Sequence, residues 1–140
     1  MSIRLRAFRE DDTEQVVALW HEAGLTRPWN DPHRDIARKL AVQRELFVVA
    51  VDGEAVVGSA MGGYDGHRGW LYYLATAASH RGRGIGADLV AEIERLLLEM
   101  GCPKVQLMVR PDNSGARGFY DAQGYEPFDT WATGKRLIAD

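Results

Sequence analysis

The sequence contains a single cysteine, Cys102, so no disulfide can form within the chain. Long hydrophobic runs are also missing, because the most apolar stretch, "LFVVAV" at 46–51, is about a third of the length of a membrane span. The first residues carry charge from Arg4 onward, which excludes the apolar centre of a signal peptide. We therefore expect a cytoplasmic protein that does not enter a membrane.

An excess of positive charge is absent as well. The 140 residues include 17 Lys and Arg against 20 Asp and Glu, a net charge of −3. This balance excludes a general basic surface for nucleic acid. The four histidines show no metal-ligand spacing, so we expect no metal site. Without a repeat or a linker, residues 1–140 are expected to form one domain.

Hydrophobic periodicity predicts the element order β-α-α-β-β-β-α-β-α-β-β. Helices are expected at 11–23, at 32–43, from Ile85 to about Gly101, and from an Asp112 or Asn113 cap to about Gln123. The expected strands are 2–8, two around the turn Asp52-Gly53 within 45–63, 69–77, 104–109, 125–128 and 130–137. The fold class is thus α/β, a mixed sheet of about seven strands with about four helices on its faces.

The stretch "SHRGRGIGADL" at 79–89 alternates glycine with arginine where a helix must begin. The first N–H groups of a helix lack internal partners, and the helix dipole places partial positive charge at the same end. Glycines allow the backbone to approach a phosphate closely, and arginines add charge-assisted donors. The stretch is therefore typical of a site for a pyrophosphate.

Two other nucleotide motifs can be compared with this stretch. A Walker A loop is excluded, because no Gly-Lys-Ser/Thr follows. The dinucleotide fingerprint G-x-G-x-x-G/A is matched at Gly82, Gly84 and Ala87. However, Arg110 stands where that fold needs an acidic residue, and the remaining chain is too short for its second half. A dinucleotide-binding oxidoreductase stays open as an alternative.

Two motifs resemble those of the GNAT family of N-acetyltransferases. "RGRGIG" at 81–86 is similar to the family's Q/R-x-x-G-x-G/A motif, which wraps the pyrophosphate of acetyl-coenzyme A. "NSGARGFYDAQGY" at 113–125 resembles N-x-x-A-x-x-x-Y-x-x-x-G-F/Y. The matched positions are Arg81, Gly84 and Gly86 in the first motif, and Asn113, Ala116, Tyr120, Gly124 and Tyr125 in the second. The resemblance covers essentially the whole chain.

This resemblance implies a GNAT-like, splayed sheet in which the strand at 70–77 parts from the strand at 104–109. The pantetheine arm of acetyl-coenzyme A then lies in the gap, beside a bulge near 74–76. Main-chain groups there would bind the pantetheine amides and polarise the thioester carbonyl. The cofactor-binding residues that follow from the resemblance are Leu74, Ala75, Thr76, Arg81, Gly82, Arg83, Gly84, Ile85, Gly86 and Asn113.

The reaction implied is the direct attack of a primary amine on acetyl-coenzyme A. Tyr120 falls on the family's tyrosine position and is the expected general acid for the leaving thiolate; its other interpretation is core packing beside Phe119. Many family members carry a glutamate base on the strand that here reads "WLYYLATA", and this sequence has none. Asp65 and His67, just before that strand, are the substitute candidates, and water relays are an alternative.

The acceptor is expected to be an amine-bearing small molecule or a protein amine. Trp29, Asn30 and Asp31 in "RPWNDP" would lie near the acceptor cleft, where the family places this loop, although a rigid loop with a packed tryptophan is an equal interpretation. A homodimer is compatible with the family. A coenzyme A-binding sensor that has lost transfer is the non-enzymatic alternative, favoured by the missing glutamate and opposed by Tyr120.

Overall fold

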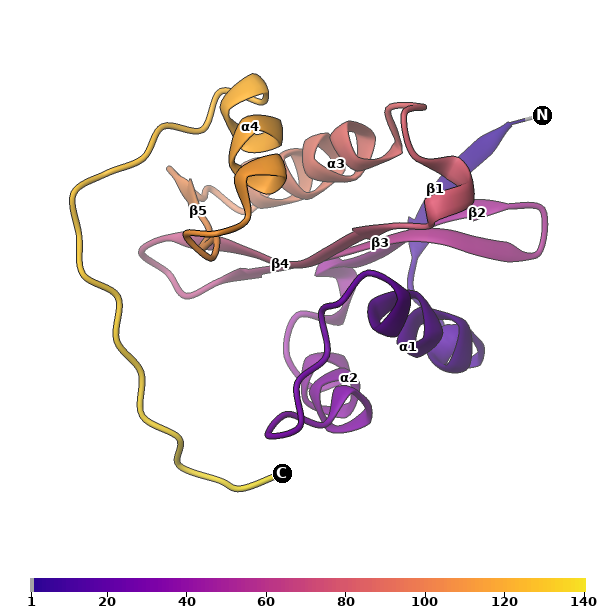
Figure 1. The fold of residues 1–140 in the computed structure, drawn as a ribbon, viewed down its shortest axis with the longest axis horizontal. Coiled ribbons are helices and arrows are strands. Elements are labelled where there is room, and N and C mark those ends of the chain that lie inside the picture. The colour runs from indigo at the N-terminus through magenta and orange to yellow at the C-terminus, as the bar shows by residue number, and fades with distance from the viewer. Residues whose placement is uncertain (1) are drawn as a thin grey trace.

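The computed structural model describes residues 2–140. A mixed sheet lies between two pairs of helices (Figure 1). The helices α1 (Thr13–Glu22) and α2 (Pro32–Leu40) cover one face, and α3 (Ile85–Glu99) and α4 (Ser114–Ala122) cover the other. Within residues 2–140 no helix has both the length and the apolar character needed to cross a membrane.

The sheet has five strands in the order β1-β2-β3-β4-β5. Neighbouring strands are antiparallel except β4 and β5, which are parallel. Their bounds are Ile3–Ala7 for β1, Phe47–Asp52 for β2, Ala55–Tyr64 for β3, Gly69–Thr76 for β4 and Val105–Gln106 for β5. The hairpin predicted at Asp52-Gly53 is confirmed, and Gly53 takes a φ of +62° in its turn.

The expectation of about seven strands is wrong. The segments 125–128 and 130–137 form no strand, and the segment 104–109 contributes only the two residues of β5. After α4 the chain runs past the side of the sheet and ends beside α2, on the opposite face from α4 (Figure 1). Pro127 has no N–H for a ladder, and this path carries the last residues away from β5, so no sixth strand can add.

Close contact between α3 and the sheet depends on two glycines of β3. A Cβ atom at Gly58 would lie 2.9 Å from the Leu89 side chain, and one at Gly62 would lie 2.8 Å from Ile93. Both distances are shorter than non-bonded carbon–carbon contacts, so a side chain at either position would force α3 or its side chains to shift. The helix buries Leu89 and Ile93 in return, as its apolar spacing predicted.

A β-bulge interrupts the pairing of β4 with β3. Ser59 faces Ala75 and Met61 faces Tyr72, so β4 carries one residue more than β3 between these pairs. Tyr73 sits in this bulge with a φ of +49°, a backbone conformation that aromatic residues rarely adopt. The bulge implied near 74–76 is therefore present, displaced by one residue toward the start of β4.

Buried polar and aromatic contacts hold Tyr73 in this conformation. Trp20 Nε1 donates to Ser59 Oγ at 2.9 Å, and Ser59 Oγ donates to the Tyr73 carbonyl at 3.2 Å. The Tyr73 ring stacks on Trp20 with 3.8 Å between the ring centroids. Trp20 and Ser59 are fully buried, so neither can exchange its partner for water. The surrounding structure thus imposes the strained backbone.

A buried ion pair fixes the start of α1. Arg6 on β1 donates to both carboxylate oxygens of Asp12, at 2.8 and 3.0 Å, and the Arg9 N–H donates to the same carboxylate at 2.8 Å. Burial opposes ionisation of Asp12, but the bonds from Arg6 and Arg9 outweigh it, so the pKa of Asp12 lies below its ordinary value. The ion pair between Arg6 and Asp12 therefore holds the turn before α1 against β1.

We predict that Ser59→Ala destabilises the protein. The substitution leaves the Trp20 N–H and the Tyr73 carbonyl buried without partners, which costs about 1–3 kcal/mol of unfolding free energy. Urea unfolding followed by tryptophan fluorescence measures the change. Ser79→Ala, which removes an exposed hydroxyl, serves as the control and should leave the midpoint unchanged. Equal midpoints for both variants would contradict the role of Ser59.

We also predict that the stabilisation from Asp12 depends on pH. A carboxyl whose pKa is lowered by folding stabilises the protein above its unfolded pKa of about 4 and loses that contribution as the pH falls. At pH 7, Asp12→Asn should lower the unfolding free energy by roughly 2–4 kcal/mol, and the difference from wild type should shrink below about pH 4. Asp11→Asn, in the same turn and exposed, is the matched control. A difference that stays constant with pH would refute this origin.

Candidate functional site

The glycine-rich turn leads from β4 into α3. Residues 81–84 are all exposed, and Gly82 and Gly84 have φ values of +80° and +81°. A Cβ at either glycine would meet nothing within 4 Å, so these glycines are required by backbone conformation and not by crowding. Gly84 is the N-cap of α3 and supplies no side-chain cap. The first N–H groups of α3 are therefore free to bind an anion.

The predicted residues of this turn occupy distinct positions. Arg81 Nε donates to the Thr76 carbonyl at 3.3 Å, which ties the turn to the end of β4. Ile85 is buried at the first position of α3, so only its backbone can face a ligand. A Cβ at Gly86 would lie 3.4 Å from the Phe119 ring and 3.6 Å from Thr76 Oγ1. Through this contact α4 packs against the first turn of α3.

β4 and β5 part immediately after they meet. Their register contains only Gly69 opposite Val105 and Trp70 opposite Gln106. Beyond Trp70 the edge of β4 that faces β5 has no strand partner within the described residues, so the main chain of 74–76 can bind another molecule. The gap opens toward the end of β4, where the glycine-rich turn begins.

The two predicted side chains of α4 lie on the α3 face of the sheet. Asn113 is the N-cap of α4 and accepts the Ala116 N–H at 3.0 Å. Tyr120 packs edge-on against Phe119 and Tyr125, with ring centroids 5.1 and 5.7 Å away. Burial raises the pKa of Tyr120 to about 12, so its hydroxyl keeps its proton at neutral pH.

Asp65 and His67 lie in the turn between β3 and β4. The Asp65 carboxylate accepts the N–H groups of His67 and Arg68, at 2.8 and 2.7 Å, and these bonds lower the pKa of Asp65. Both residues are exposed. Tyr73, in the bulge, lies four residues beyond the start of β4 at Gly69, a span of about 13 Å along an extended strand. The structure thus places this pair near one end of β4 and the glycine-rich turn near the other.

On the face of the sheet covered by α1 and α2, the loop before α2 contacts the bulge of β4. Asp35 accepts the Tyr73 hydroxyl at 2.6 Å and also the Asn30 amide, and Asn30 Nδ2 lies 3.1 Å from the Tyr73 oxygen. The predicted loop residue Asn30 is therefore beside β4, whereas Trp29 is 58% exposed and Asp31 caps α2 by accepting the His33 N–H. Burial and the Asp35 carboxylate raise the pKa of Tyr73.

An open, shallow pocket of about 370 Å³ lies between α2 and β4. Its lining residues include Asp35, Arg38, Lys39, Met61, Tyr72 and Tyr73. None of these side chains was expected at the site from the sequence. The only signal was the spacing of Asp35 and Arg38, which places them on one side of a helix. Burial lowers the pKa of Lys39, whose ammonium donates to the Gly62 carbonyl.

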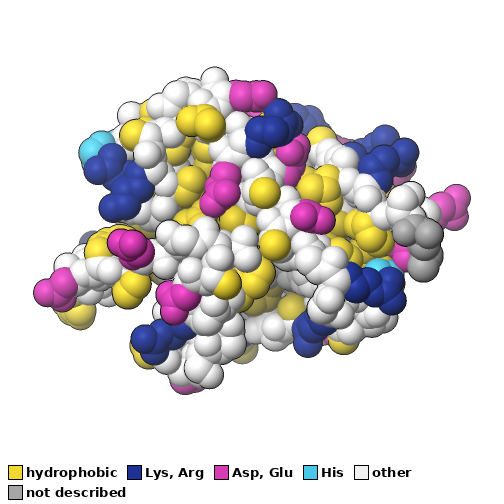
Figure 2. All heavy atoms as spheres, turned by 90° about the horizontal axis from the view of Figure 1, so that it is seen from above, with side chains coloured by type: hydrophobic (Ala, Val, Ile, Leu, Met, Phe, Trp, Pro, Cys, Tyr) yellow, Lys and Arg dark blue, Asp and Glu magenta, His cyan; other side chains and the backbone are white. Residues whose placement is uncertain are grey.

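The surface charge on the α3 and α4 side is divided into small groups. Figure 2 shows Lys and Arg side chains in separate clusters near the margin of this face, with acidic side chains between them. Residues 2–140 hold no group of three or more His, Cys, Asp or Glu side chains that could bind a metal ion. The site is thus formed by a backbone gap, a glycine-rich turn and a pocket with both signs of charge.

Comparison with known proteins gives the same family from sequence and from structure. The acetyltransferase (GNAT) family matches residues 5–125. An acetyltransferase of Pectobacterium atrosepticum is 52% identical over 139 residues, which cover 99% of this chain and 98% of that protein. A Yersinia pestis protein named as an uncharacterized N-acetyltransferase is 49% identical over 138 residues, with the same coverage.

The fold is similar to that of a solved enzyme. The aminoglycoside N-acetyltransferase AAC(6')-Iy in complex with CoA superposes with a TM-score of 0.77 at 17% identity, over 98% of this chain and 96% of that one. The family match, the relatives at about half identity and this shared fold agree with the glycine-rich turn and the parting strands described above. The chain belongs to the GNAT family of acetyltransferases.

Proposed function

We propose that the chain, as one domain, is an N-acetyltransferase that moves the acetyl group of acetyl-coenzyme A to a primary amine in a ternary complex. The observation that carries this proposal is the combination of the exposed glycine-rich turn with the unpaired edge of β4 beside it. CoA is also present in the solved AAC(6')-Iy complex, whose fold this chain shares.

In this proposal the pyrophosphate of the cofactor lies on the first turn of α3. The N–H groups of Ile85 and Gly86 donate to its oxygens, and the left-handed Gly82 and Gly84 keep side chains out of the way. The guanidinium groups of Arg81 and Arg83 balance its charge. Asn113, which caps α4 with its side-chain oxygen, adds a polar contact from the facing helix.

The pantetheine arm would take the place of a strand partner for β4. Backbone groups of Leu74, Ala75 and Thr76, freed by the parting of β5, bond its amides. A backbone N–H at the bulge then stabilises the oxyanion that forms on the thioester carbonyl. In other enzymes, removal of one such donor lowers kcat by about 10²–10³-fold. Holding both substrates in one cleft supplies further acceleration.

The chemical step is attack of the neutral amine nitrogen on the thioester carbon. A C–N bond forms, the C–S bond breaks, and coenzyme A leaves as a thiolate that takes a proton from Tyr120. The amine loses one proton to a base, and solvent returns a proton to the Tyr120 oxygen. Tyr120 is half-buried and its phenol keeps its proton at neutral pH, so the acid form is the one present when the thiolate leaves.

His67 and Asp65 are the proposed proton acceptors of the amine. They would act through water, because their turn precedes Gly69, which itself lies about 13 Å along β4 from the bulge. Of the two, His67 suits a base better, since bonds from two N–H groups lower the pKa of Asp65. Asp35 is nearer to the bulge, through its 2.6 Å bond from Tyr73, and is the competing candidate. The pH dependence of kcat in His67→Gln and Asp35→Asn distinguishes them.

Cofactor binding is the first test. We expect acetyl-coenzyme A and coenzyme A to bind with micromolar affinity in calorimetric titrations, and NAD(H) to give no heat. Gly84→Glu should weaken binding at least ~10-fold, because it places a carboxylate and backbone strain at the pyrophosphate site. Gly101→Glu is the matched control: Gly101 also has a positive φ, +84°, but follows the other end of α3. Binding of NAD(H) alone would contradict the proposal.

Removal of the Tyr120 hydroxyl tests the chemistry. In Tyr120→Phe we expect kcat to fall by about 10²-fold with the KM for acetyl-coenzyme A unchanged, measured by release of free thiol with a mixture of amines. In wild type the acid form of Tyr120 persists to about pH 12, so this group causes no loss of rate between pH 7 and pH 10.

Tyr125→Phe is the control for this substitution, because it removes a neighbouring hydroxyl that bonds to Glu94 at 2.7 Å. Its kcat should match wild type. Acetyl-coenzyme A binding without any thiol release from wild type would instead favour the coenzyme A-binding sensor.

A further inference from the structure

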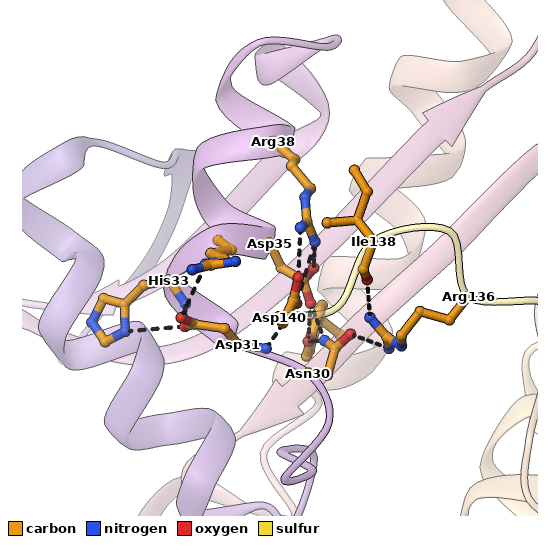
Figure 3. Close-up of polar contacts among 10 residues, drawn as sticks. Asn30, Asp31, His33, Asp35, Arg38, Arg136, Ile138 and Asp140 are labelled. Atoms are coloured by element: carbon orange, nitrogen blue, oxygen red, sulfur yellow. Dashed lines mark hydrogen bonds and ion pairs between the residues drawn. The ribbon is translucent and has the colours of Figure 1, made fainter.

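The chain itself supplies a carboxylate, Asp140, to Arg38, which lines the pocket between α2 and β4. Arg38 donates to Asp140 from Nη2 at 2.6 Å and from Nη1 at 3.4 Å, and the Asp31 N–H donates to the same carboxylate at 3.0 Å (Figure 3). A planar guanidinium beside a backbone N–H matches the two oxygens of a carboxylate. The hydrogen bond from Arg38, followed by that from Asp31, lowers the pKa of Asp140 to about 2, so the bound group is ionised.

A second carboxylate, that of Asp35, contacts the same guanidinium. Asp35 Oδ1 is 3.3 Å from Arg38 Nη1, the nitrogen that also contacts Asp140. Asp35 lines the pocket and is joined to the bulge through the Tyr73 hydroxyl. The pocket therefore presents, next to each other, a site that holds an anion and a carboxylate that attracts an amine.

Segment 134–138 completes this arrangement from the last part of the chain. Arg136 donates to Asn30 Oδ1 at 3.1 Å and to the Ile138 carbonyl at 3.2 Å, as Figure 3 shows. These bonds hold the end of this segment near the start of α2, where Asp140 meets Asp31 and Arg38; Asp140 itself does not line the pocket. The Asp140 side chain is only 1% exposed, so a ligand must displace it to reach Arg38; a ligand carboxylate could then accept the same bonds from Arg38 and the Asp31 N–H.

We infer that Arg38 and the Asp31 N–H bind a carboxylate of the acceptor while Asp35 receives its amine, so that the acceptor belongs to the amino-acid class. This inference rests on the proposed N-acetyltransferase function. One guanidinium contacts both positions, so the ligand's amine and carboxylate are separated by only a few bonds. A polyamine, which has no carboxylate, would leave Arg38 Nη2 without a carboxylate partner if it displaced Asp140.

The test compares each of the standard amino acids with its own carboxamide, in calorimetric titrations of the protein saturated with coenzyme A. We expect at least one amino acid to bind, and its carboxamide to bind about 10–100-fold more weakly, as loss of a charge-assisted bond predicts. Arg38→Gln should abolish this preference. Arg95→Gln on α3, which removes the same charge from the other face of the sheet, is the control.

The variant Asp140→Asn distinguishes a ligand-binding role of Arg38 from a purely structural ion pair between Arg38 and Asp140. If Asp140 competes with the ligand, the variant binds the amino acid several-fold more tightly and its carboxamide unchanged. Weaker amino-acid binding in this variant, equal binding of the two forms by wild type, or no binding by any member of the panel would each overturn the inference. Acetyl transfer to polyamines or peptide amines, without a carboxylate preference, would overturn it and leave the proposed function intact.

Discussion

The bulge at Tyr73 is the constraint on which the rest of the site depends. Without the bulge, β4 would pair regularly with β3 along its whole length, and the N–H and C=O groups on the edge that faces β5 would lie in one straight row. The extra residue, with its φ of +49°, re-aims the strand just before Leu74. This conformation persists because Trp20 stacks on the tyrosine ring and Ser59 binds its carbonyl inside the core.

The same residue joins the two faces of the sheet. The main chain after Tyr73 borders the gap between β4 and β5, on the way to the glycine-rich turn and α3. Its side chain instead lies on the face of α1 and α2, where the hydroxyl meets Asp35. A thioester in the gap and an amine at Asp35 would therefore both lie beside the bulge of β4, and direct transfer requires the two to meet there.

Charge is divided between these faces in a way that suits two substrates. At the start of α3 the free N–H groups and nearby arginines favour the phosphates of a cofactor. Near α2, the carboxylate of Asp35 and the guanidinium of Arg38 are adjacent, so neither sign dominates the pocket. The net charge of −3 says nothing about either site, because each depends on a few neighbouring groups.

The sequence alone determined the local features of this protein. Periodicity located the helices, Asn113 marked the cap of α4, and the glycines of 82–86 marked the helix start that an anion can approach, since each depends on residues adjacent in the chain. Tertiary structure decided the rest. The segment after Tyr125 has strand-like residues but no partner within reach, and Asp35, Tyr73 and Asp140 meet only because distant elements pack together. Such contacts depend on how distant elements pack across the sheet, and a local sequence pattern does not predict that packing.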